Sequence, residues 1–216
     1  MKISNKGLVE LVGHEGVCLS KYKDSVGVWT IGIGATKSEI SDLASWPLSK
    51  TITMQEAFEL LKKGVGKYEE AINKSLTKTI RQPQFDALVS WCYNVGTGWA
   101  KKASIIKYLN QGIEGGMLFD ALMMYNKPKE IIGRRTKEAK LITYGEYSNG
   151  GKALLFPVSA SGHPVYKKGT SINVWEYIDK KAEVEPVPIK ATPVEEKAAE
   201  PSLMRKIFNL FTGDRN

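Results

Sequence analysis

One stretch near the N-terminus constrains the fold of this chain more than any other, because a helix there leads directly into a hairpin. Apolar residues at helical spacing run up to Glu15, and Gly16 is typical of a residue that ends a helix. Residues 21–33 predict a strand, a tight turn at 25–27 and a second strand rich in β-forming side chains. Glu15 would then lie at a helix end and Asp24 at a hairpin tip, which are two ways of directing carboxylates into one cleft.

These two carboxylates, together with a hydroxyl, suggest a chemistry. Asp24 follows Glu15 by nine residues, and Thr30 follows Asp24 by six. Two carboxyl groups can cleave a glycosidic bond, because one protonates the leaving oxygen while the other acts on the sugar carbon or on a water molecule. Each residue also has an ordinary interpretation: a solvated helix end for Glu15, a turn for Asp24 and a β-branched strand position for Thr30.

The spacing Glu, eight residues, Asp, five residues, Thr, followed by Ile-Gly-x-Gly, resembles the phage-type lysozymes of glycoside hydrolase family 24. Three later segments continue the resemblance in the same order: Gln84–Gly96, Ser104–Gly112 and Gly133–Glu138. The resemblance covers roughly residues 3–148. One departure is Ala35, where some members carry a histidine that supports the fold. Its absence leaves the catalytic set intact and removes one stabilising ion pair.

The resemblance implies an α+β fold with two lobes. A small lobe would contain a helix and the β-hairpin, a larger lobe would be helical, and a long helix near residues 54–73 would join them beside a cleft. Glu15 would be the general acid, which requires an environment that keeps it protonated. Asp24 would stay ionised and stabilise positive charge at the sugar carbon or orient the nucleophile. Thr30 would hold the attacking water.

Six further residues are implied to bind the substrate: Thr36, Tyr93, Asn94, Ser104, Arg134 and Arg135. Asn94 is suggestive because a buried amide needs hydrogen-bond partners. Tyr93 is equally typical of a core residue, although its main-chain carbonyl could hold an N-acetyl group, and Ser104 could instead cap its helix. One of the two arginines would pair with Glu15, the alternative being a solvated helix start. His14 is more typical of a surface or packing histidine than of a proton carrier.

The implied reaction is hydrolysis of the β-1,4 bond between N-acetylmuramic acid and N-acetylglucosamine in bacterial peptidoglycan. The implied role is that of a phage or prophage endolysin that lyses its host. Two other classes stay open: a secreted antibacterial effector with the same fold, and a non-catalytic module that binds the wall. The intact set of Glu15, Asp24 and Thr30 argues against the last of these.

Composition adds a charge argument. The chain has 216 residues, 42% of them hydrophobic, so it can bury a core in one or two domains. Its net charge of +8 belongs to residues 1–178, with 24 Lys and Arg against 16 Asp and Glu, because residues 179–216 carry seven of each. Such charge suits an acidic polymer, and without a nucleic-acid motif we favour the wall over nucleic acid, with a monomeric protein.

Scattered cysteines and histidines predict neither a metal site nor a cofactor. Cys92 is expected to be buried packing, whereas Cys18 is expected to be a reduced thiol, with a bridge to Cys92 as the alternative. The N-terminus lacks the apolar core of a signal peptide, and no run approaches 18 apolar residues. The protein is therefore expected in the producer's cytoplasm, and the resemblance implies a membrane-permeabilising partner that releases it.

Further signals predict the remaining helices. A capping box at residues 53–56 opens a helix that Gly64 and Gly66 would weaken or bend, and Pro83 begins the next one. Later helices are expected near 104–111, 115–125 and 135–147.

The C-terminal part divides by composition, after a lysozyme-like catalytic domain at 1–150. Residues 151–180 predict a small extension in which runs at 152–158 and 164–168 could form a β-hairpin. Residues 181–201 are typical of a Pro-rich linker, and 202–212 predict a short amphipathic helix. That helix could dock on anionic membrane, on the protein itself or on a partner.

Overall fold

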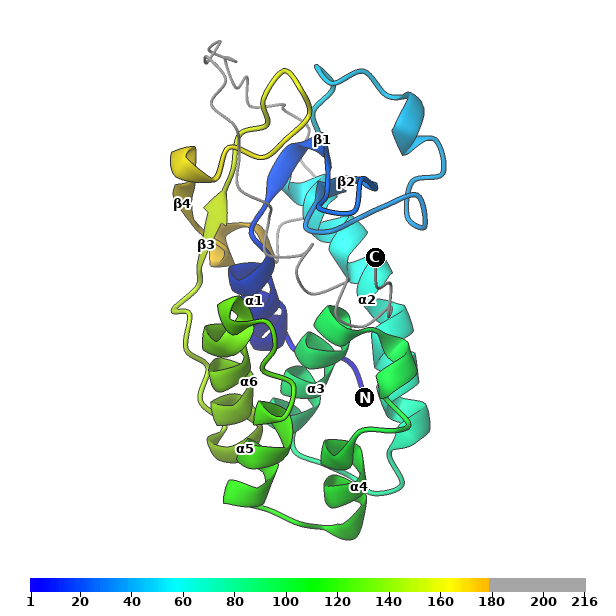
Figure 1. Ribbon diagram of the computed structural model, residues 1–216, viewed down its shortest axis with the longest axis vertical. Coiled ribbons are helices and arrows are strands. Elements are labelled where there is room, and N and C mark those ends of the chain that lie inside the picture. Colours follow the sequence, from blue (N-terminus) through cyan, green and yellow to red (C-terminus); the bar gives the residue numbers. More distant parts are fainter. Residues whose placement is uncertain (179–216) are drawn as a thin grey trace. The chain divides into compact units, whose positions relative to one another are not determined.

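The computed structural model describes residues 1–178, which form two compact units. Residues 1–14 and 65–150 make the helical unit, and residues 15–64 and 151–178 make the hairpin unit. Figure 1 labels the elements. Helices and two small antiparallel sheets build these units, so the predicted α+β class is confirmed. The segments predicted as linker, 181–201, and as amphipathic helix, 202–212, lie outside the described residues, and their roles stay predictions.

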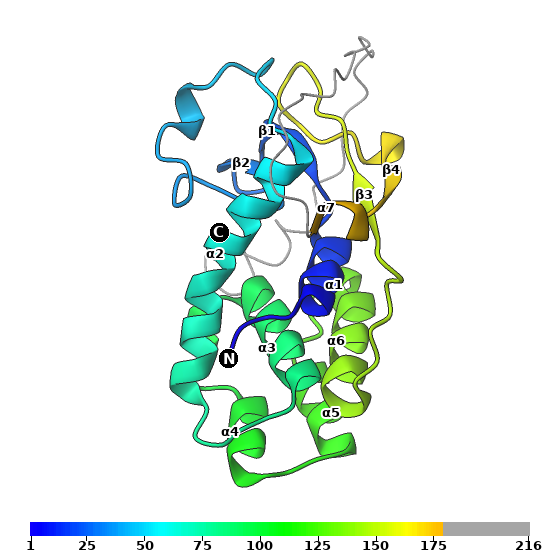
Figure 2. The ribbon, with the colours of Figure 1, turned by 180° about the vertical axis from the view of Figure 1, so that it is seen from behind.

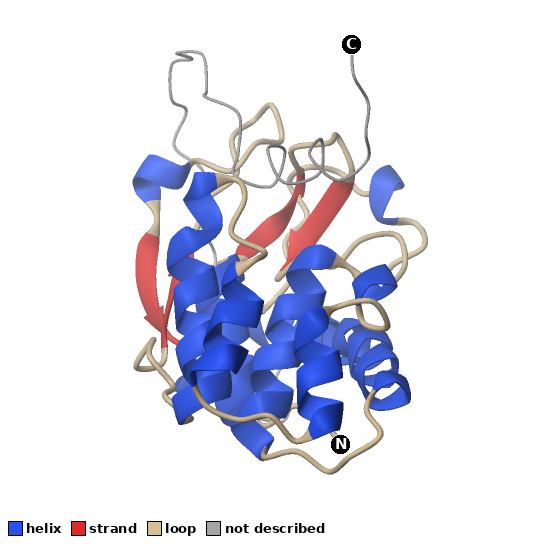
Figure 3. Ribbon diagram, turned by 60° about the horizontal axis from the view of Figure 1, so that its bottom comes forward, coloured by secondary structure: helices blue, strands red, loops and turns tan. Residues whose placement is uncertain are grey.

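The first sheet of the hairpin unit is the predicted hairpin, drawn in red in Figure 3. Strands β1 (Cys18–Lys23) and β2 (Trp29–Gly32) pair antiparallel, with Tyr22 opposite Thr30. The turn lies at 25–27 as predicted, and it contains Gly27 at φ +81°. Three successive residues of β2, from Thr30 to Gly32, are buried, and Ile31 belongs to the core of this unit. The local sequence pattern therefore predicts the two strands and their turn, whereas the register shift between Cys18 and Tyr22 was not predicted.

Helix α1 (Asn5–Glu15) ends where the sequence predicts, because Gly16 follows at φ +71°, a conformation that favours glycine. Helix α2 (Met54–Ser75) opens with the predicted capping box. The Thr53 amide donates to Glu56 Oε2 at 2.7 Å, and the Glu56 amide donates to Thr53 Oγ1 at 3.1 Å. The helix continues through its two glycines as one element.

The helical unit is built around helix α6 (Ile132–Tyr144), which packs against α3 (Gln82–Val95) and α5 (Gly116–Met123), as Figures 1 and 2 show. Helix α4 (Ser104–Gln111) has the predicted bounds. The prediction of 135–147 for α6 was displaced by three residues. The helix stops because Gly145 adopts φ +77° and its amide bonds the Leu141 carbonyl at 2.9 Å.

Residues 151–178 form the second sheet, in which β3 (Lys152–Leu155) pairs antiparallel with β4 (Thr170–Asn173). The position predicted for the second strand, 164–168, was wrong: Pro164 makes only an isolated bridge with Val158 before a 3₁₀ turn. Helix α7 (Trp175–Ile178), visible in Figure 2, ends the described chain. Short 3₁₀ helices in residues 1–178 are η1 (Leu43–Ser45), η2 (Thr97–Trp99), η3 (Lys129–Ile131) and η4 (Tyr166–Lys168). No helix within residues 1–178 has the length and apolar character to cross a membrane.

Candidate active site

The hairpin turn fixes the Asp24 carboxylate from one side. Asp24 Oδ1 accepts hydrogen bonds from the amides of Val26 at 3.0 Å and Val28 at 2.8 Å. The main chain of Asp24 closes the same turn, since its amide donates to the Val28 carbonyl at 3.0 Å. Within residues 1–178 the other carboxylate oxygen, Oδ2, accepts no hydrogen bond. The turn therefore orients the carboxylate and leaves one oxygen for a ligand.

Thr30 lies beside this turn on β2. Its side chain is buried, with 4% of the residue exposed, and its hydroxyl donates to the Val28 carbonyl at 3.1 Å. Because a hydroxyl that donates once still has acceptor lone pairs, Thr30 Oγ1 can accept a hydrogen bond from a water molecule. Val28 thus connects the two residues, with its amide bound to Asp24 and its carbonyl bound to Thr30.

Tyr22 is a member of this site that the sequence analysis missed. It pairs directly with Thr30, so the two side chains share one face of the hairpin. Its pKa is raised well above 10, first by burial and then by nearby groups that include Glu15 and Asp24. Both predicted catalytic carboxylates therefore lie within electrostatic range of one phenol. The signal in the sequence was the i, i+2 spacing of Tyr22 and Asp24, which is the period of a strand.

Glu15 is the last residue of α1 and is partly exposed. Thr36, a predicted substrate-binding residue in the same unit, lies in a turn whose polar groups bond one another. Its amide donates to Glu39 Oε2 at 2.9 Å, and its hydroxyl lies 2.8 Å from that of Ser38. These bonds give Thr36 a structural role in the turn, and its substrate contact stays a prediction.

In the helical unit, Arg134 and Arg135 meet a buried carboxylate on their own helix, Glu138. Arg134 Nε donates to Glu138 Oε1 at 2.9 Å, and Arg135 Nη1 donates to Glu138 Oε2. Ser90 on α3 adds its hydroxyl at 2.6 Å from Oε1. Burial alone would raise the pKa of Glu138, but the two guanidinium groups outweigh it and the pKa is lowered. The ion pair predicted between one arginine and Glu15 stays a prediction.

Asn94 is bound to this same cluster. Its Oδ1 accepts a hydrogen bond of 2.6 Å from Arg135 Nη2, while Arg135 Nε donates to the Tyr125 carbonyl at 2.9 Å. Arg135 is fully buried. Asn94 is partly buried, and its bond with Arg135 links α3 to α6. The contacts of Asn94, Arg134 and Arg135 with substrate stay predictions.

His14 faces the charges of α6. Burial lowers the pKa of His14 to about 3, and Arg134 lowers it further, while Glu138 opposes the shift. Lys137 and Arg135 act in the same direction as Arg134. A histidine with this pKa is neutral near pH 7, which fits the packing interpretation and not a proton carrier.

Tyr93 and Ser104 have protein contacts. The ring of Tyr93 lies 4.8 Å from that of Tyr68, centroid to centroid. Ser104 does not cap α4, because Ala103 occupies the N-cap position and no side chain bonds the helix start. Its hydroxyl lies 3.6 Å from the Met124 sulfur, which is a weak acceptor. Their contacts with sugar stay predictions.

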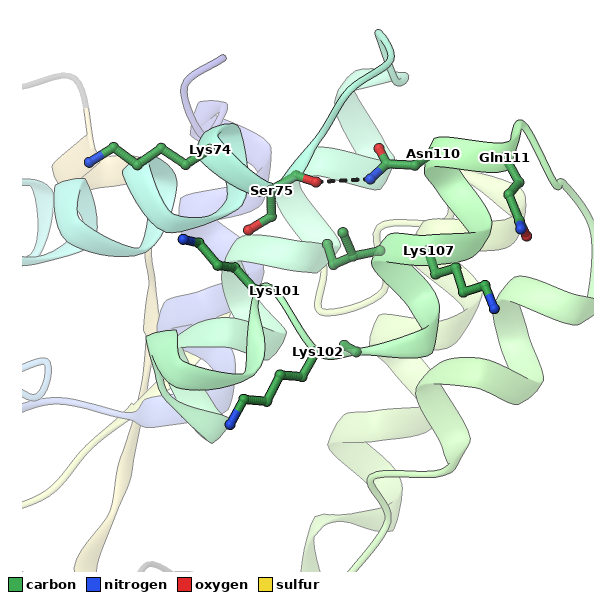
Figure 4. Close-up of a pocket in the computed structure, with 9 residues that line it drawn as sticks. Lys74, Ser75, Lys101, Lys102, Lys107, Asn110 and Gln111 are labelled. Carbon is green, nitrogen blue, oxygen red and sulfur yellow. Dashed lines mark hydrogen bonds between the residues drawn. The ribbon is translucent and has the colours of Figure 1, made fainter.

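A basic pocket of about 530 Å³ opens in the helical unit between the end of α2 and the start of α4. Four lysines line it, as Figure 4 shows: Lys74, Lys101, Lys102 and Lys107. Asn110 holds the walls together, donating to the Ser75 carbonyl at 2.9 Å. No carboxylate lines the pocket. None of the site residues predicted from sequence belongs to it.

Cys18 and Cys92 are both free and buried, and burial raises the pKa of each thiol to about 12. The alternative of a bridge between them is not observed. No group of three His, Cys, Asp or Glu residues within the described chain could hold a metal ion.

Comparisons with known proteins agree on one family. The model of the Phage lysozyme family matches residues 12–138. The endolysin of Salmonella phage P22 is 33% identical over 147 residues, which cover 65% of this chain and 97% of that endolysin. A solved structure of a P22 lysozyme mutant is 31% identical and superposes with a TM-score of 0.60, covering 66% of this chain and 98% of its own.

The endolysin of Bacillus phage PZA is 31% identical over 156 residues, which cover 69% of this chain. The match spans only 58% of that endolysin's length. The similarity therefore extends over nearly all of the P22 protein and over less than two thirds of the PZA protein.

Proposed function

Because the chain belongs to the phage lysozyme family, we propose that it is an N-acetylmuramidase, a glycoside hydrolase that acts as a phage or prophage endolysin. Its substrate is the β-1,4 bond between N-acetylmuramic acid and N-acetylglucosamine in peptidoglycan. The single observation that carries the proposal is the link between Asp24 and Thr30 through Val28, whose amide donates to the Asp24 carboxylate and whose carbonyl accepts from the Thr30 hydroxyl.

In this proposal Glu15 protonates the leaving oxygen. General acid catalysis of this kind contributes about 10²–10⁴-fold to the rate. Asp24 supplies a negative charge, and the turn amides that donate to its Oδ1 hold the carboxylate in place. Its second oxygen faces the positive charge that develops at the sugar carbon. Thr30 orients the attacking water with the acceptor side of its hydroxyl.

The basic pocket supports a proposal about the substrate surface. Lys101, Lys102 and Lys107 make no ion pair within residues 1–178, whereas Lys74 pairs with Glu70 at 2.5 Å. Peptidoglycan carries carboxylates on its stem peptides, and a cluster of unpaired cations raises the local concentration of such a polymer. We assign the pocket to electrostatic attraction of the wall and not to the reaction.

Release remains part of the proposal. An endolysin made inside its host needs access to the wall, so we propose that a membrane-permeabilising partner lets it through. The protein would act as a monomer on glycan strands, without nucleic acid.

Clearing of Gram-negative cells stripped of their outer membrane tests the function. The parent protein should lower the turbidity, and Glu15→Gln should clear at a rate lower by about 10²–10⁴-fold, because the amide cannot donate the proton. Glu59→Gln is the matched control, since Glu59 is an exposed carboxylate on α2 of the same unit. Clearing by Glu15→Gln at the parent rate would remove Glu15 from the mechanism, and no clearing by the parent would remove the proposed function.

A further inference from the structure

Residues that follow the family match in the chain contact the hairpin that carries Asp24 and Thr30. The Phage lysozyme model ends at residue 138, yet residues 151–178, here called the C-terminal extension, belong to the hairpin unit. The loop between β3 and β4, yellow in Figure 1, runs beside β1. Its contacts fall next to both predicted catalytic carboxylates.

The first contact adjoins Glu15. The Val17 amide donates to the Leu154 carbonyl at 2.8 Å, and the Phe156 amide donates to the Val17 carbonyl at 2.8 Å. Between them, Gly16 lies against the ring of Phe156 so closely that an added Cβ would be 2.7 Å from it. The residue that follows Glu15 is thus enclosed by the extension.

The second contact adjoins Asp24. The Lys23 amide donates to the Gly162 carbonyl at 2.8 Å. Gly162 has φ +80°, and a Cβ there would lie 3.3 Å from the side chains of Trp29 and Leu48, so the absence of a side chain lets the loop lie close to both. The residue that precedes Asp24 is held by this bond.

The far end of the extension is anchored independently of these contacts. The ring of Tyr177 stacks on that of Phe58 with centroids 6.4 Å apart. Lys62 on α2 donates to the Ile178 carbonyl at 2.9 Å, and the Ile178 side chain is fully buried. The extension is therefore held at α2 and at both ends of β1. These contacts can restrict the motion of the hairpin turn.

We propose that the C-terminal extension is a positioning element for the reaction, with Phe156 and Gly162 as its positioning residues. The inference rests on the proposed function, because it assigns Glu15 and Asp24 as the groups that must be held. Phe156 acts on Glu15 through Gly16, and Gly162 acts on Asp24 through Lys23. A displacement of about 1 Å in a catalytic group can cost about 10²-fold in rate.

Steady-state kinetics on soluble peptidoglycan fragments test Phe156 in the full chain. Phe156→Ala should lower kcat by about 10-fold or more while KM stays within about twofold, because positioning of the reacting groups changes and binding does not. Phe156→Tyr, which keeps the ring, should restore kcat. Phe119→Ala is the matched control, because Phe119 is a partly exposed phenylalanine on α5 of the helical unit. If Phe156→Ala does not fold, Phe156→Leu carries the same test.

The role of Gly162 is tested by one variant and one control variant. Gly162→Ala places a methyl group against Trp29 and Leu48, whereas Gly115→Ala meets nothing within 4 Å although Gly115 has a similar φ of +75°. Both substitutions place a Cβ at a positive φ, so a fall in kcat only for Gly162→Ala points to its contacts with Trp29 and Leu48. Equal kcat for each variant and its control would overturn the inference.

Hydrogen exchange separates this inference from the proposed function. The amides of Val17 and Lys23 should lose protection in Phe156→Ala and Gly162→Ala, respectively, and keep it in the controls. An inactive parent would refute the muramidase proposal. The exchange pattern would still show whether the extension holds the hairpin in place. Unchanged exchange in both variants would refute the positioning role, whatever the activity.

Discussion

Glu138 in the helical unit and Asp24 in the hairpin unit are both carboxylates held in place, but their surroundings differ. Glu138 is buried, and its two oxygens meet two guanidinium groups and the Ser90 hydroxyl. Asp24 is partly exposed, has no ion pair within residues 1–178, and is bonded through one oxygen to main-chain amides. A carboxylate whose partners fill both oxygens stabilises the fold, whereas one held from a single side can meet a ligand.

The strongest test of this comparison is to remove the charge of the buried carboxylate, Glu138. Glu138→Gln removes the buried carboxylate that Arg134 and Arg135 both contact, and breaking a buried pair in this way costs about 3–5 kcal/mol. Urea unfolding at pH 7 measures the loss. Glu70→Gln is the control, because its pair with Lys74 is exposed on α2, and its unfolding midpoint should match the parent. A Glu138→Gln midpoint equal to that of the control would show that the cluster does not support the fold.

The exposed member should behave in the opposite way. Asp24→Asn keeps an oxygen that accepts from the amides of Val26 and Val28, so the unfolding midpoint should stay at the parent value. The lost charge should reduce peptidoglycan hydrolysis by about 10²-fold or more, as removal of one transition-state contact does. A destabilised but fully active variant would reverse the roles assigned to the two carboxylates.

The sequence analysis predicted the hairpin well because its determinants are local. Gly16, Gly27 and the β-forming run around Thr30 lie within one segment. The buried cluster was harder to predict, because Arg and Glu at i, i+4 are usually on the surface, and Asn94 lies 41 residues from Arg135. The partner of β3 was missed for the same reason, since the pairing of Leu155 with Thr170 spans a loop without strand periodicity.

The pH dependence of stability sharpens the description of the cluster. The pKa of His14 is about 3 in the folded protein, against an ordinary value of 6.5, so the unfolded chain takes up this proton first as pH falls. Stability should therefore decline from pH 6.5 downward, with a slope that approaches about 1.4 kcal/mol per pH unit. His14→Gln should remove that decline between pH 6.5 and 4.5, below which Glu138 also titrates. If the free energy of unfolding falls equally with pH in the parent and the variant between pH 6.5 and 4.5, a neutral His14 beside Arg134 is contradicted.

The smallest expected effect concerns the basic pocket. Replacing Lys101, Lys102 and Lys107 by Gln should reduce wall binding by a few fold at low salt and weaken its salt dependence, because such attraction is screened over about 8–10 Å near 0.1–0.15 M. The control replaces three exposed lysines elsewhere in the helical unit, Lys127, Lys129 and Lys140. Sedimentation with purified walls across a salt series is the measurement. Equal losses in the two triple variants would show that net charge matters and the pocket does not.

The identity of the reducing ends released from purified peptidoglycan tests the central claim most directly. Hydrolysis of the bond that joins N-acetylmuramic acid to N-acetylglucosamine leaves muramic acid at the new reducing end, and borohydride reduction followed by mass spectrometry identifies it. Muramitol-ended fragments from the parent, formed by Glu15→Gln at a rate lower by about 10²–10⁴-fold, are the predicted result. Fragments that end in reduced N-acetylglucosamine, or stem peptides cut from intact glycan, would contradict it.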